Sequence, residues 1–241
     1  MAVDVLSPAA RRARLALVTP KVARVPAPAR PQAAEPATPW REGLPTLVGT
    51  GLVLRELRVE DAPNLAGLLT AENVAKFLAP PPRTASGVRR FVRWTHRKRA
   101  EGRYLCFGIV PAGSEHAVGF FQIRSTDGGF ETAEWGFVLG RPYWGSGLFV
   151  EGAHLLLRFA FDTLGVRRLE ARAVAENGRA NGALRKLGAV EEGVLREAIT
   201  IEGREYDMTM WSILGRDWQA RTGKSRAFAR LRSGPGPRRV K

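Results

Sequence analysis

"RPYWGSGLFVEGAHLLLRFAF", residues 141–161, connects a strand-like run to a long run with helical spacing, and two glycines lie at the connection. Positions 148, 152, 155, 156 and 159 fall on one helical stripe, which predicts a helix over 147–164. Glycines at such a junction are typical of an ordinary tight turn. They also let an anion approach the backbone amides at the start of a helix. The spacing excludes a Walker A loop and the dinucleotide fingerprint, because neither Gly-Lys-Ser/Thr nor a third glycine follows.

The flanking segments alternate between the two periodicities. The strand-like runs are 50–58, 104–110, 117–125, 132–139, 167–174, 189–201 and 205–214, and the helical patterns are 60–70, 84–102, 147–164 and 178–188. Short Gly/Ser/Asp-rich connections within 104–139 predict an antiparallel meander. The order predicts an α/β architecture, a mixed sheet with helices on both faces.

The charge is concentrated at the two ends of the chain. The net charge is +15, of which residues 1–46 contribute +4 and residues 215–241 contribute +8. We expect a disordered Pro/Ala/Arg-rich extension over 1–46, one folded domain over 47–220 and a disordered basic tail over 221–241. Basic tails of this kind favour polyanions such as RNA or the ribosome, or stay solvated. The arginines of 84–102 allow the same two interpretations.

The rest of the composition bears on disulfides, metal sites, membrane helices and targeting signals. The single cysteine, Cys106, excludes an intramolecular disulfide, and three scattered histidines show no metal-ligand spacing, so we expect no metal. No apolar run approaches the roughly 18 residues of a membrane helix. "LALV" at 15–18 is too short for a signal peptide. An organelle transit peptide is the alternative to the cytoplasmic location that we expect.

Three blocks of the sequence resemble a known family. They are "AEWGFVLGRPYWGSGL", "RRLEARAVAENGRANGALRKLGAVEEGVLRE" and "EGREYDMTMWSIL". In this order they are similar to the GNAT superfamily of N-acetyltransferases, and most similar to its ribosomal-protein-alanine N-acetyltransferase branch, over roughly residues 50–220. The resemblance implies a mixed, mostly antiparallel twisted sheet of about seven strands with helices on both faces. It also implies direct transfer of acetyl from acetyl-CoA to a primary amine, without an acyl-enzyme.

The resemblance also implies the site. The turn at 145–148 would hold the pyrophosphate, and the end of the preceding strand would bind the pantetheine arm as an added strand. Glu134 would be the base that deprotonates the amine, and Asn177 would contact the cofactor or a catalytic water. The residues implied to bind the cofactor are Phe137, Val138, Leu139, Trp144, Gly145, Ser146, Gly147, Leu148, Asn177 and Asn181.

The sequence departs from the family pattern at some positions. Phe149 is bulky where the family turn ends in a small residue, so it either turns into the core or crowds the phosphates. The family's general-acid tyrosine and serine would fall at Leu184 and Ala180, which leaves that role unassigned. The acceptor that the resemblance favours is a protein N-terminal α-amine. A small-molecule amine, and an idle GNAT-like domain that binds nucleic acid or a protein, remain alternatives. Met208 and Trp211 face either the core or a homodimer interface.

Overall fold

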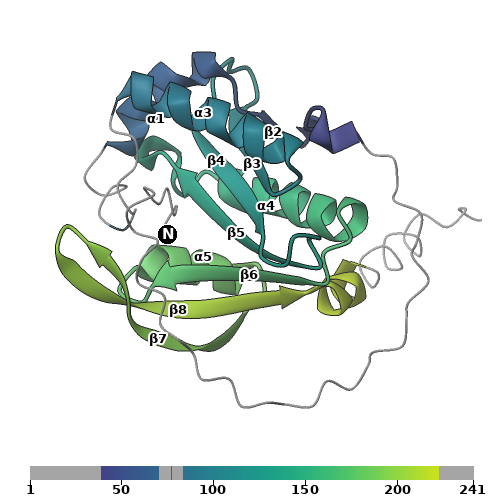
Figure 1. Cartoon of the computed structure of the whole chain (residues 1–241), viewed down its shortest axis with the longest axis vertical. Coiled ribbons are helices and arrows are strands. Elements are labelled where there is room, and N and C mark those ends of the chain that lie inside the picture. Colours follow the sequence, from purple (N-terminus) through teal and green to yellow (C-terminus); the bar gives the residue numbers. More distant parts are fainter. Residues whose placement is uncertain (1–38, 71–76, 78–83, 223–241) are drawn as a thin grey trace, which may run out of the picture.

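The computed structural model describes residues 39–70, 77 and 84–222. These residues form one mixed sheet with the strand order β1-β2-β3-β4-β5-β6-β8-β7 (Figure 1). All neighbouring strands are antiparallel except β5 and β6, which are parallel. The strands are β1 (Leu47–Val48), β2 (Leu52–Glu56), β3 (Tyr104–Pro111), β4 (Gly119–Ser125), β5 (Thr132–Leu139), β6 (Arg168–Val174), β7 (Val190–Ile201) and β8 (Arg204–Leu214).

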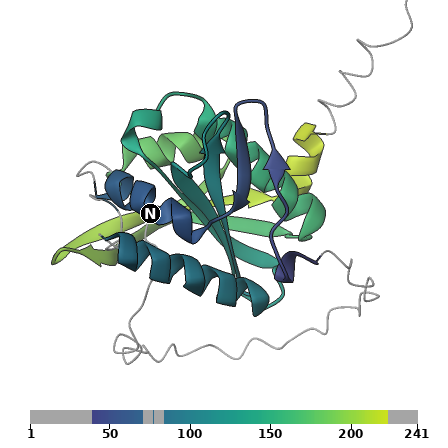
Figure 2. The same cartoon turned by 90° about the horizontal axis from the view of Figure 1, so that it is seen from above.

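Helices cover both faces of this sheet, as Figure 2 shows. The helices are α1 (Ala62–Leu69), α3 (Ala85–Ala100), α4 (Leu148–Arg158) and α5 (Gly178–Lys186). Buried residues of α4 and α5 share one apolar cluster with the sheet, and those of α1 and α3 share the other. We call these sides the α4 face and the α3 face. Successive side chains of a strand point to opposite faces of the sheet. On β5, Trp135 therefore packs in the α4-face cluster, whereas Val138 packs in the α3-face cluster.

The predicted fold class is confirmed, and β5 has the predicted bounds. Two details differ. The two-residue strand β1 was missed, because so short a segment shows no periodicity. The predicted helix 147–164 is α-helical only to Arg158 and continues as a π-helical turn, Phe159–Thr163.

The predicted chain ends lie largely outside the described residues. The described part begins at Pro39, before the predicted boundary at 47, and its 3-10 turn Pro39–Arg41 brings the Trp40 ring within 5.6 Å of the Phe130 ring. The predicted tail is described only to residue 222. No helix in the described ranges is long and apolar enough to cross a membrane.

The pairing of β5 with β6 is short, and this positions the site. The two strands are in register only from Thr132↔Arg168 to Glu134↔Glu170. Beyond that point β5 stays with β4 up to Leu139, whereas β6 stays with β8 up to Val174. Over residues 135–139, β5 therefore no longer pairs with β6.

Candidate active site

The glycine turn leads directly into α4. Gly145 and Gly147 have φ of 78° and 86°, a left-handed conformation that residues with a Cβ rarely adopt. A Cβ added at either position would meet nothing within 4 Å, so conformation rather than crowding calls for glycine. Within the described residues, the amides of Gly145, Ser146 and Gly147 donate no hydrogen bond. These free donors at the N-terminal end of an 11-residue helix form an anion site, which the helix dipole strengthens.

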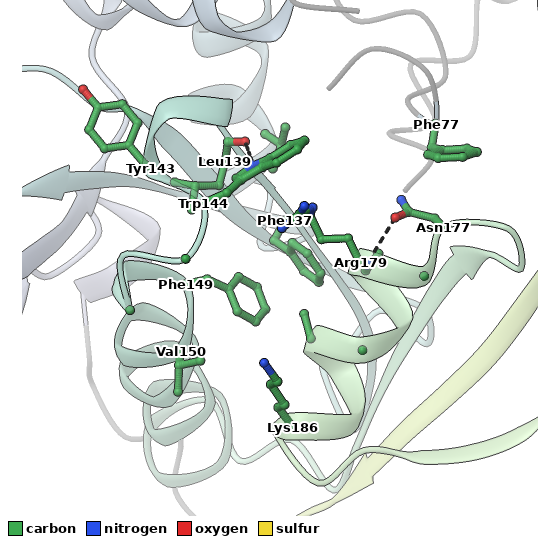
Figure 3. Close-up of a pocket in the computed structure, with 17 residues that line it drawn as sticks. Phe77, Phe137, Leu139, Tyr143, Trp144, Phe149, Val150, Asn177, Arg179 and Lys186 are labelled. Atoms are coloured by element: carbon green, nitrogen blue, oxygen red, sulfur yellow. Dashed lines mark hydrogen bonds between the residues drawn. The ribbon is translucent and has the colours of Figure 1, made fainter. Parts of the chain in front are cut away.

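A cavity of about 860 Å³ opens beside this turn (Figure 3). The end of β5, the turn and the start of α4 form one side, and α5 forms the other. Arg179 and Lys186 contribute positive charge, and none of the described residues that line it is acidic. The Arg179 guanidinium lies 4.2 Å from the centre of the Trp144 ring, which holds it over the cavity wall. An elongated ligand with phosphates and an apolar arm fits this lining.

Phe149 forms part of the wall. Its ring centre is 4.4 Å from that of Phe137 and 5.8 Å from that of Phe121, so the side chain packs against the sheet. It also lines the cavity, where it lies beside Phe137 in Figure 3. The open space beside Gly145 and Gly147 remains. Of the two expected outcomes, packing toward the core is the one observed.

The structure brings most of the predicted cofactor residues together. The cavity is lined by Phe137, Val138, Leu139, Trp144, Gly145, Gly147 and Asn177, but not by Ser146, Leu148 or Asn181. The Trp144 indole Nε1 donates to the Leu139 carbonyl at 2.7 Å, which fixes the turn to the strand end. The Ser146 hydroxyl donates to the Tyr143 carbonyl at 2.7 Å.

The two predicted asparagines have different surroundings. Asn177 is the N-cap of α5, where its Oδ1 accepts from the Ala180 amide at 3.0 Å, and it lines the cavity. Asn181 is buried; its Oδ1 accepts from the Trp211 indole at 2.9 Å, and its Nδ2 contacts three carbonyl oxygens. These bonds saturate the Asn181 amide, and it joins β6, α5 and β8 rather than facing the cavity.

Glu134 lies where β5 and β6 part, and it does not line the cavity. Its side chain is 18% exposed and forms a 2.6 Å ion pair with Arg124 of β4. Its register partner on β6 is Glu170, which is 16% exposed and forms a 2.7 Å ion pair with Arg168. Two carboxylates side by side on adjacent strands repel each other. An ammonium group at this position would relieve the repulsion.

Arg172, two residues after Glu170 on β6, faces the same way, since Leu169, Ala171 and Ala173 pack in the α4-face cluster. Its Nε is buried and has no hydrogen-bond partner in the described part of the chain. A buried unpaired donor is unfavourable unless a ligand satisfies it. Sequence reasoning missed Glu170 and Arg172, although the alternation in "RLEARAV" already placed them on one face.

Metal ligands do not gather anywhere in the described ranges, where no group of three or more His, Cys, Asp or Glu side chains could hold an ion.

Comparisons with known proteins agree with this geometry. Residues 51–190 match the family model described as an acetyltransferase (GNAT) domain. The chain is 30% identical to the uncharacterized N-acetyltransferase p20 of Bacillus licheniformis, covering 72% of this chain and 98% of that one. It is 26% identical to the [ribosomal protein uS5]-alanine N-acetyltransferase of Escherichia coli (strain K12), over 49% of this chain and 61% of that one.

Solved structures show the same fold. The microcin C7 self immunity acetyltransferase MccE, solved with acetyl-CoA and AMP, has a TM-score of 0.63 at 21% identity, covering 69% of this chain and 93% of that one. The chain therefore belongs to the GNAT acetyltransferase family and is an acetyl-CoA-dependent N-acetyltransferase.

Proposed function

We propose that this enzyme acetylates the N-terminal α-amine of a protein, with a ribosomal protein as the first acceptor to test. The observation that carries the proposal is the group Glu134, Glu170 and Arg172 on the α3 face, where β5 and β6 part. A peptide N-terminus presents an ammonium group next to a carbonyl oxygen. The carboxylates suit the ammonium, and the free Arg172 donor suits the carbonyl. The likeness to a ribosomal-protein-alanine N-acetyltransferase supports the same acceptor class.

The cavity on the α4 face is the proposed acetyl-CoA site. We assign the pyrophosphate to the amides of Gly145, Ser146, Gly147 and Leu148, and the pantetheine arm to the end of β5, Phe137–Leu139, where β5 no longer pairs with β6. Trp144, Asn177 and Asn181 complete the predicted set, with Asn181 supporting α5 from behind. Arg179 and Lys186 are additional phosphate ligands that the sequence did not reveal.

Each catalytic side chain has one proposed task. Bound acetyl-CoA supplies the acetyl group as a thioester. Glu134 accepts a proton from the acceptor ammonium, directly or through water, because only the neutral amine has a lone pair for attack. Asn177 uses its Oδ1 as the α5 cap, which leaves its Nδ2 to donate to the cofactor or a catalytic water. A thiol has a reference pKa near 8.5, so the leaving thiolate needs little help from an acid.

The acceptor is tested with a matched peptide panel. The full-length enzyme and acetyl-CoA are incubated with ribosomal-protein N-terminal peptides that start with Ala or Ser. The controls are the same peptides with a blocked N-terminus and one free lysine, and spermidine. Fragmentation mass spectrometry should locate the acetyl group on the α-nitrogen only. Acetylation of spermidine or lysine alone would refute the acceptor and leave the acetyltransferase assignment intact.

The cofactor site is tested by calorimetry with Gly147→Ala. An added Cβ disfavours the left-handed backbone by roughly 1–2 kcal/mol. We expect the reshaped turn to weaken acetyl-CoA binding about tenfold. Gly113→Ala is the control, because Gly113 has a φ of 76°, has open space around it and lies in the β3–β4 turn. Gly113→Ala should lower the free energy of unfolding about as much as Gly147→Ala does, but its affinity for acetyl-CoA should equal that of the wild type. Equal binding by both variants would contradict the assigned cradle.

A further inference from the structure

Helix α3 carries a row of arginines on its exposed side. Arg90, Arg93 and Arg97 are exposed, and Arg89 is half-buried beside them. We call Arg90, Arg93 and Arg97 the α3 arginine stripe. Within the described residues, none of the three forms an ion pair or a side-chain hydrogen bond. The next cations along the helix are paired: Lys98 with Glu101, and Arg99 with Glu56.

This stripe disfavours the helix that carries it. Arg93 is three residues after Arg90 and four before Arg97, so like charges are neighbours on the helix surface. Such pairs each destabilise a helix by about 0.2–0.5 kcal/mol. Residues 85–100 contain no acidic residue, and Glu101, directly after the helix, interacts electrostatically with Arg97 but forms its ion pair with Lys98. The buried side of α3, with Val88, Phe91 and Val92, anchors the helix without the stripe. An ordinary solvated face would mix both signs of charge.

The chemistry of the stripe limits the classes of ligand that it can bind. All three members are arginines, whose planar guanidinium binds phosphate with two parallel hydrogen bonds. The exposed large apolar residues of the described chain lie on β1, α4 and β7, and none is on α3. The stripe therefore lacks the apolar residues that insert into membranes or anchor protein interfaces.

Base recognition is also disfavoured at this surface. The Trp94 ring is already engaged, with its centre 6.0 Å from the Phe91 ring and 4.8 Å from the Tyr104 ring. It is not available as a stacking platform for bases. The stripe spans about 10 Å along the helix axis, about three nucleotide rises of ~3.4 Å. We propose that α3 binds the phosphate backbone of RNA, without sequence preference.

The position of α3 makes this surface independent of the proposed acetyl-CoA cavity. The helix packs on the sheet face opposite α4 and α5, which line the acetyl-CoA cavity (Figure 2). A nucleic acid on the stripe would leave that cavity open. For an enzyme that modifies ribosomal proteins, such contacts would raise its concentration near RNA-bound acceptors.

The test compares two triple variants of the full-length protein. The first replaces the stripe: Arg90→Gln, Arg93→Gln and Arg97→Gln. The second replaces three exposed arginines elsewhere: Arg158→Gln, Arg196→Gln and Arg216→Gln. Both keep residues 1–46 and the basic tail 221–241 unchanged and have equal net charge. Fluorescence anisotropy with a 20-nucleotide RNA, and with DNA of the same sequence, is followed over a range of KCl concentrations.

We expect the stripe variant to lower the magnitude of the slope of log affinity against log salt by about 2. Each phosphate contact with a single strand contributes about 0.7 to the slope, and three contacts are lost. The control should change it by less than about 0.7, one contact. Acetylation of a free peptide should be unchanged in both. Equal RNA and DNA affinity would support backbone binding. Equal losses of RNA affinity in the two variants would overturn the proposal. It would also be overturned if the stripe variant lost binding to phosphatidylserine vesicles but kept its binding to RNA.

Discussion

Two regions of the molecule pair carboxylates with arginines, but they differ in how completely their polar groups are hydrogen-bonded. At the corner between β2 and α1, fully buried Asp61 forms a two-pronged pair with Arg55, with both distances at 2.8 Å. At the junction of β5 and β6, Glu134 and Glu170 each have one arginine partner among the described residues, where the buried Arg172 Nε has none. The first region is complete without a ligand and stabilises the fold. The second leaves polar groups unsatisfied, as a binding site does.

The corner is satisfied because both oxygens of Asp61 accept two hydrogen bonds each. The amides of Arg58 and Ala117 also donate to its carboxylate, at 2.8 and 2.9 Å. Burial by itself would raise the pKa of Asp61, but the hydrogen bonds from Arg55 and from these two amides outweigh it and lower the pKa. Asp61 therefore stays ionised in the core and joins β2, α1 and the segment before β4.

The largest effect expected is on stability, from Asp61→Asn. The change leaves Arg55 buried without a counter-ion, which should lower the free energy of unfolding by about 3–5 kcal/mol. Urea unfolding measures the loss. The double variant Asp61→Leu/Arg55→Met should lose less than the single variant, because it removes both charges. A loss below about 1 kcal/mol in the single variant would show that the corner is not a stabilising pair.

The next effect is on catalysis, from Glu134→Gln. We expect the rate of α-amine acetylation to fall by about 10²–10⁴, the usual contribution of a general base. Acetyl-CoA affinity should be unchanged, because Glu134 lies outside the cavity. The control is Glu131→Gln, which removes a nearby exposed glutamate that is also paired with one arginine, Arg167. Equal rates in both variants would move the base elsewhere in the junction.

A smaller effect is expected from Arg172→Met. It removes the unsatisfied donor, so stability should stay within about 0.5 kcal/mol or rise, unlike the corner. If Arg172 binds the acceptor carbonyl, KM for peptide should rise by about 10-fold or more, as a charged hydrogen bond is worth about 1.5–3 kcal/mol. Arg172→Lys should recover part of the affinity. An unchanged KM with a large loss of stability would make Arg172 a structural residue.

The comparison also shows what sequence reasoning can reach. The strand-like run 132–139 predicted β5 with the bounds that the structure gives, because most of its residues are apolar and Gly- and Pro-containing segments flank it. The glycine turn was also predicted, and the structure gives Gly145 and Gly147 positive φ values, whereas anion binding there stays a prediction. Both features depend on residues close together in the sequence, which a local pattern can describe.

Features that depend on distant pairing were not predictable. Glu170 was visible as a strand residue, but its place beside Glu134 depends on where β5 and β6 separate. Asn181 was expected at the cofactor, yet its amide is saturated partly by Trp211, 30 residues away. No local pattern identifies such a partner.

The smallest effect is expected at a third group of ion pairs. Its carboxylate has hydrogen-bond partners but is partly exposed, so it distinguishes the effect of hydrogen bonding from the effect of burial. Glu192 on β7 accepts hydrogen bonds from Arg168 and from the Ser212 hydroxyl, which lower its pKa from 4.5 to about 2. The hydrogen bonds to Glu192 and to Glu170 raise the pKa of Arg168. The cluster is satisfied, as Asp61 is, but the Glu192 side chain is 36% exposed. Solvent should reduce its worth to less than about 1 kcal/mol.

The pH dependence of Glu192→Gln tests this. Because the folded-state pKa is lowered, the carboxylate stabilises the fold fully above about pH 4.5 and loses this effect as the pH falls toward 2. Wild type should therefore exceed Glu192→Gln in free energy of unfolding at pH 6, and the difference should shrink at pH 3. A loss as large as that of Asp61→Asn would mean that saturated hydrogen bonding, rather than burial, makes an ion pair structural. A small, pH-dependent loss would assign that role to burial.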